Sequence, residues 1–217
     1  MKRTITILLA LTLALGAVSC GGNNGSTDTS ADTSADTTVD TSADTTVDTS
    51  ADTSAPAESE ATTDAPIDIL KKVWESYGED EKFASTGGDF TDEIVEGPGA
   101  YSALDGDTLD SVLGFPAASI DKIDSAASFM HMMNANTFTS GAYHVKDSAD
   151  IETLATELRD NIQARQWMCG FPETLVVASV GDVVISAFGK KAFIDTFVNK
   201  LSDLYPDANV IITEPIE

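Results

Sequence analysis

Hydrophobic positions after residue 64 recur with a helical period in three stretches of the chain. One covers residues 66–77, another runs from Asp150 to a stop at Gly170, and the last covers residues 193–204. Apolar residues spaced three and four apart form one face of a helix, so we predict three amphipathic helices. A shorter helix, followed by a glycine, is predicted over residues 107–113.

Alternating and β-branched residues predict strands between and after these helices. Residues 119–146 have the pattern of two strands joined at Asn134-Ala135-Asn136. Residues 174–179 and 183–188 have the pattern of a hairpin with a tight turn. A last short strand is predicted over residues 210–213.

The predicted order, α-α-β-β-α-β-β-α-β, puts residues 65–217 in the α+β class as a single domain. Strands that follow one another through short turns form an antiparallel or mixed sheet. We therefore expect a small sheet of about five strands with the helices packed mainly on one face. No element is assigned to the glycine-rich residues 78–104.

Residues 1–19 have the pattern of a cleavable signal peptide. Lys2 and Arg3 precede an apolar run over residues 5–18, and small residues follow it. The run is too short for a comfortable bilayer span. We therefore expect the chain to be exported.

The next feature is the sequence Ala17-Val18-Ser19-Cys20, which resembles the lipobox of bacterial lipoproteins. In that family the cysteine thiol receives a diacylglycerol and becomes the first residue after cleavage. The resemblance implies that Cys20 is lipidated and holds the protein on the outer face of the cell membrane. The same small residues would also suit the ordinary signal peptidase, which would release a soluble secreted form.

Residues 20–64 form an acidic, low-complexity segment. Aspartate recurs every fourth residue from Asp28 to Asp52, and residues 21–66 hold ten acidic side chains and no lysine or arginine. Aspartates four apart repel one another on a helix, so we predict a disordered tether. The net charge of the whole chain is -24, which argues against nucleic-acid binding and leaves a cationic ligand as a possible partner.

Residues 101–212 resemble an uncharacterised domain family of Gram-positive bacterial lipoproteins. The cues are the short helix Leu109-Asp110-Ser111-Val112-Leu113-Gly114, the strand end Ala142-Tyr143-His144-Val145-Lys146-Asp147, and the helix leading into Gln166-Trp167. The resemblance covers about half of the chain. The family has no established activity, so it implies architecture and location only.

The two histidines, His131 and His144, are candidate metal ligands. We expect them to lie several residues apart on the predicted hairpin, too far apart to share an ion. Methionines around His131 could hold Cu(I), but adaptable packing in the core accounts for them better. Asp107 is expected to cap the short helix. No metal site and no cofactor is predicted.

Four carboxylates are the remaining candidates for catalysis: Asp89, Asp92, Glu93 and Glu96. Paired carboxylates are what a glycoside hydrolase needs, whereas charge runs in glycine-rich loops are usually solvated. The leading hypothesis is a non-enzymatic binding domain that contacts another envelope protein or a cationic ligand. The alternatives are an envelope or cell-wall modifying hydrolase that uses these carboxylates, and a small solute-binding lipoprotein that serves a transporter.

Overall fold

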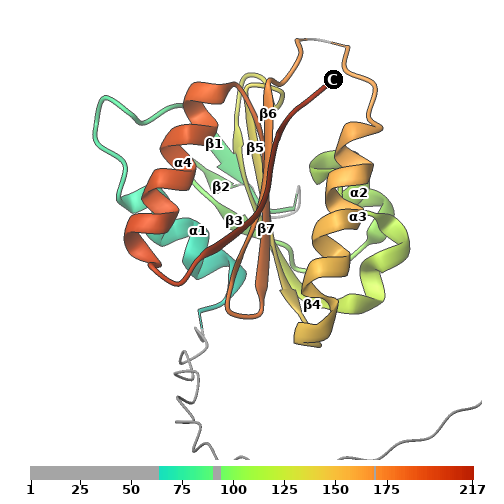
Figure 1. Cartoon of the computed structure of the whole chain (residues 1–217). Helices are drawn as coiled ribbons and strands as arrows, with labels where there is room; N and C mark the ends of the chain where they lie inside the picture. Colours follow the sequence, from blue (N-terminus) through green and yellow to red (C-terminus); the bar gives the residue numbers. More distant parts are fainter. Residues whose placement is uncertain (1–63, 90–93, 169) are drawn as a thin grey trace, which may run out of the picture. The chain divides into compact units, whose positions relative to one another are not determined.

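The computed structural model describes residues 64–89, 94–168 and 170–217, and Figure 1 shows their arrangement. The predicted signal peptide, Cys20 and residues 21–63 of the predicted tether lie outside the described residues. The helices are α1 (Pro66–Glu75), α2 (Gly106–Leu113), η1 (Ala117–Lys122), η2 (Ser148–Asp150), α3 (Ile151–Gln163) and α4 (Lys191–Leu204). Within the described ranges, no helix has both the length and the apolar character needed to cross a membrane.

One antiparallel sheet contains all the strands of the described residues. The strands are β1 (Ser85–Gly87), β2 (Ile94–Val95), β3 (Gly99–Ala100), β4 (Ile123–His131), β5 (Phe138–Val145), β6 (Thr174–Val180), β7 (Val183–Gly189) and β8 (Asn209–Pro215). Across the sheet the order is β2-β1-β4-β5-β7-β6-β8, and β3 pairs with β4 beside β1. The long hairpins β4–β5 and β6–β7 therefore form the centre, and β8 lies at one end.

Helices cover both faces of this sheet, which corrects the expectation that they lie mainly on one face. In Figure 1 the sheet is seen nearly edge-on, with α1 and α4 on one side and α2 and α3 on the other. All seven residues of β7 are buried. A strand that is buried on both faces needs a layer of side chains on each side, and a single helical layer could not supply both.

The core on the α1 side is dominated by aromatic rings. Trp74 of α1 lies 5.1 Å from the ring of Phe129, which in turn lies 5.1 Å from Phe138. Phe83, from the segment after α1, stacks 5.4 Å from Phe129. Aromatic pairs at these separations stabilise a core beyond the area that they bury. They fix α1 and the following segment against β4 and β5.

The α+β class is confirmed, whereas the expected five strands and their order are not. The difference comes from β1, β2 and β3, which lie in the glycine-rich segment to which no element was assigned. Strands of two or three residues are too short to show a hydrophobic period. Glycine is required there by close backbone approach, because a Cβ on Gly87 would collide with the backbone of Ser128 and Gly99.

Two helix ends also differ from the prediction. α3 ends at Gln163, before the predicted stop at Gly170. The side chain that caps α2 is Asp105, whose Oδ1 accepts a hydrogen bond from the Thr108 backbone N–H at 2.8 Å. Asp107 was the wrong choice because it lies within the first turn, where its side chain is past the capping position.

Candidate functional site

The two histidines are far apart, as expected. His144 pairs with Ser125 near the start of β4, whereas His131 ends that strand, which separates the histidines by about 20 Å. His131 stacks on Phe83 with ring centroids 5.4 Å apart, and His144 Nδ1 lies 2.7 Å from Asp124 Oδ1. In the described part of the chain, no three His, Cys, Asp or Glu side chains are placed to hold a metal ion.

The methionines beside His131 do not share one role. Met130 is buried in the core on the α3 side, which confirms core packing for this residue. Met132 and Met133 are 43% and 79% exposed in the turn after β4, so core packing was wrong for these two. The strand ends at His131, and beyond it the alternation of buried and exposed positions stops.

The predicted acidic cluster is only partly described. Asp92 and Glu93 lie outside the described residues. Asp89 accepts hydrogen bonds from both the backbone N–H and the hydroxyl of Ser102, which ties two loop segments together. Glu96 is exposed, has a φ of 75°, and donates its backbone N–H to the Ser85 carbonyl. Asp89 thus makes structural hydrogen bonds, and Glu96 takes part in a turn through its backbone.

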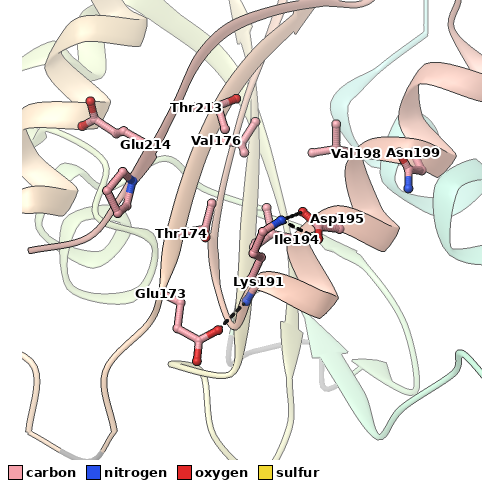
Figure 2. Close-up of a pocket in the computed structure, with 11 residues that line it drawn as sticks. Glu173, Thr174, Val176, Lys191, Ile194, Asp195, Val198, Asn199, Thr213 and Glu214 are labelled. Carbon is pink, nitrogen blue, oxygen red and sulfur yellow. Dashed lines mark hydrogen bonds and ion pairs between the residues drawn. The ribbon is translucent and has the colours of Figure 1, made fainter.

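A groove of about 630 Å³ opens elsewhere, between α4 and the end of the sheet (Figure 2). Val176 of β6 and Thr213 of β8 are register partners and lie on the same face of the sheet. Val176 belongs to the core beneath α1 and α4, and Thr213 continues this face outward. Val198 and Asn199 of α4 line the opposite wall. The groove therefore runs along β8 with a helical wall on one side.

A second hollow of about 490 Å³ lies on the α3 side of β8. It is lined by Arg159 and Gln163 of α3 and by the chain from Glu214 to its end. Glu214 pairs with Leu175, which belongs to the core on the α3 side, so Glu214 points to the face opposite Thr213. Thr213 and Glu214, which are successive residues of β8, thus point to opposite faces of the sheet, one toward each hollow.

The strand between the two hollows has one unpaired edge. β8 pairs with β6 at six of its seven residues, and among the described strands none pairs with its other edge. In Figure 1 it is the dark red segment that passes between α4 and α3 and leads to the point marked C. Such an edge presents a row of backbone N–H and C=O groups to any chain that can lie beside it.

Carboxylates outnumber cations around the two hollows. The acidic side chains that line them are those of Glu173, Asp195, Glu214 and Glu217, and the cationic ones are those of Arg159 and Lys191. Both cations have carboxylate partners: Lys191 Nζ lies 2.7 Å from each carboxylate oxygen of Asp195, and an Arg159 guanidinium nitrogen lies 4.0 Å from Glu214 Oε2. The remaining carboxylates give the surroundings of β8 a net negative charge, in keeping with the charge of the whole chain.

Glu173 shows how the acidic rim is held in place. Its carboxylate accepts the Lys191 backbone N–H at 2.9 Å, at the start of α4, and the Lys190 Nζ at 3.0 Å. These two hydrogen bonds lower the pKa of Glu173 from its ordinary value, so the group is ionised at neutral pH. Glu173, which directly precedes β6, thereby accepts the first backbone N–H of α4 and fixes one end of the groove.

None of these groove residues was predicted as a site residue. The sequence predicts the last strand, but it does not show that this strand lies at the end of the sheet or how the two neighbouring helices are placed beside it. No protein-family model matches this chain, and no curated protein or solved structure is significantly similar to it.

Proposed function

We propose that this chain is a lipoprotein of the bacterial envelope whose folded domain binds another protein and catalyses no reaction. In this proposal Cys20 carries the lipid, and residues 20–64 are the spacer that their acidic, low-complexity composition predicts. As a flexible coil this spacer spans on the order of 35–40 Å, and charge repulsion extends it further. The domain can then reach a partner at a distance from the membrane to which the chain is anchored.

The observation that supports binding is the unpaired edge of β8 with an open hollow on each face. A catalytic site needs polar groups that converge on one point. The sequence candidates that the structure describes do not converge: the histidines lie at opposite ends of the β4–β5 hairpin, and Asp89 is engaged by Ser102. An extended surface beside a strand instead suits the recognition of another chain.

The test is crosslinking inside living cells. A photo-reactive phenylalanine is placed at position 213, whose exposed side chain lines the groove, and in a separate variant at position 152, which is exposed on α3 and lines neither hollow. We expect a discrete protein adduct from position 213 and none from position 152. No adduct from position 213, or the same adducts from both positions, would contradict a binding surface at β8.

The anchor is tested on the same cells. Mass spectrometry of the native chain is expected to find a diacylated Cys20 as the first residue, and Cys20→Ser is expected to abolish the modification. An unmodified native chain, or one that still carries its leader, would contradict the lipoprotein assignment. In that case the crosslinking result would describe the binding of a domain that is not lipid-anchored.

A further inference from the structure

We propose that the ligand of this surface is a basic segment of another envelope protein, which binds in extended conformation and adds to the sheet as a strand beside β8. This inference rests on the proposed function and specifies the kind of ligand that the domain binds. It combines three independent features of the described residues: the backbone of β8, the two hollows and the charge around them.

The backbone of β8 provides the pairing edge. A strand of seven residues offers an edge of about 24 Å. In an antiparallel pair, about half of the backbone groups point away from the partner strand, and here that partner is β6. The register with β6 is regular from Ile212 to Pro215 and shifts near Val210. Pairing is therefore expected to stop before Pro215, which has no N–H to donate and whose carbonyl already accepts a hydrogen bond from Gln163 Nε2 at 2.8 Å.

The two hollows fit the side chains of an added strand. Residues of an extended chain point alternately to the two faces of the sheet. One set would enter the groove beside α4, and the other set would enter the hollow beside α3. In strand addition, main-chain hydrogen bonds supply affinity and such alternating hollows supply specificity. A flat sheet end, with helices covering it fully on both faces, would leave no room for these side chains.

Charge selects among the possible occupants. Four carboxylates and two cations line the two hollows. Lys191 pairs with Asp195 and Arg159 lies near Glu214, which leaves a net negative charge that favours lysine and arginine on the incoming strand. A second copy of this chain carries the same net charge of -24 and would be repelled. The tether of the chain itself is excluded for the same reason, since residues 21–66 hold ten acidic side chains and no basic one.

The inference is tested with synthetic peptides and the full chain in detergent. The probe is the labelled peptide Lys-Val-Lys-Thr-Val-Thr-Lys-Val-Lys, which puts its lysines on one face of a strand. A second peptide has glutamate in place of every lysine. A third keeps the lysines but carries N-methyl groups on alternate backbone amides, which prevents strand pairing along that edge. Fluorescence anisotropy measures the Kd of each peptide.

We expect the basic peptide to bind and the glutamate peptide to bind at least about tenfold more weakly, because the carboxylates repel it. The N-methylated peptide is also expected to bind about tenfold more weakly, because it cannot form the ladder hydrogen bonds. Binding of the basic peptide is expected to weaken severalfold between about 0.05 and 0.5 M salt, since exposed charges are screened.

Variants of the chain test whether the basic peptide binds beside β8. The double substitution Glu214→Gln with Glu217→Gln is expected to raise the Kd of the basic peptide about fivefold, because two carboxylates beside the edge are lost. Asn199 is exposed in the wall of the groove, and Asn199→Trp is expected to weaken binding of the basic peptide because the larger side chain fills the groove. The matched control is Glu75→Gln with Asp80→Asn, which removes the same charge from exposed positions outside both hollows. The control should leave the Kd within about twofold of wild type.

The outcomes separate this inference from the proposed function. A protein adduct at position 213 in cells, together with equal binding of the basic and glutamate peptides, would overturn the inference and leave the function standing. Equal binding of the N-methylated peptide would also overturn it, since pairing with β8 would then be unnecessary. An adduct that is a second copy of this chain would replace the inference with self-association. No adduct and no peptide binding would overturn both.

Discussion

The substitution Gly141→Ala tests the packing on the α3 side of the sheet. Gly141 lies in β5, two residues before Tyr143 on the same face, and the Tyr143 ring folds back across it. A Cβ added at Gly141 would lie 2.6 Å from Tyr143 Cζ, in contact with the hydroxyl oxygen as well, and 3.2 Å from Leu113 Cδ1. The Tyr143 side chain is fully buried and packs against Phe115 at 4.8 Å, so the ring has no free space into which to move.

The expected loss of stability follows from two opposing effects. Overpacking a core typically costs 1–3 kcal/mol, and we expect about 3 kcal/mol here because the displaced atoms belong to a fully buried ring. Replacing glycine with alanine also restricts the unfolded chain, which returns about 0.4–1 kcal/mol. The net loss is about 2 kcal/mol, or a fall in Tm of about 4–8 °C for a domain of this size.

Urea unfolding followed by circular dichroism measures this loss, with Gly78→Ala as the control. A Cβ at Gly78 would lie 3.0 Å from the exposed Asp80 carboxylate and at an ordinary contact distance of 3.4 Å from Glu81, so this variant should be neutral or slightly stabilised. In a Tyr143→Leu background the ring is absent, and Gly141→Ala should then cost less than about 0.5 kcal/mol. The packing argument would be refuted if Gly141→Ala had the wild-type free energy of unfolding, or if the substitution cost as much stability in the Tyr143→Leu background as in the wild type.

Two further predictions concern capping and pH. Asp105→Ala should lower the Tm by about 2–4 °C because α2 loses its cap, whereas Asp107→Ala should change the Tm by less than about 1 °C. Equal effects of the two substitutions would show that the cap is misassigned. The pKa of Asp64 is lowered mainly by the hydrogen bond from Lys72 and next by the one from Tyr205. These hydrogen bonds therefore contribute their full stability above about pH 4, the ordinary pKa of aspartate. The contribution is lost as the pH falls through the lowered pKa of Asp64. Asp64→Asn should therefore lower the urea midpoint at pH 7 and lose this difference near pH 2, and a difference independent of pH would contradict the assignment.

Much of the domain was predictable from local patterns. The amphipathic stripes of α1, α3 and α4 are periodic over ten or more residues, and each of these helices occurs where the stripe predicts it. The β6–β7 hairpin follows from β-branched runs on either side of a glycine turn. These signals depend only on neighbouring residues, so the sequence contains them completely. The acidic charge is likewise a property of composition.

Other features depended on contacts between distant parts of the chain. Strands β1 to β3 exist because they pair with one another and with β4, and two or three residues with glycine carry no period of their own. The division of the helices between the two faces depends on which side of the sheet each connection crosses. That division could have been suspected from β7, whose apolar run is interrupted only by Ser186 and indicates burial on both faces.

The candidate site illustrates the same limit. The sequence by itself determined the export leader pattern, the acidic tether composition, the major helices and the presence of a last strand. Only the tertiary structure decided that this strand ends the sheet with a hollow on each face. The physical reason is that a hollow forms where packing elements fail to meet, and this depends on the relative positions of α3, α4 and β8 rather than on the residues of any one of them.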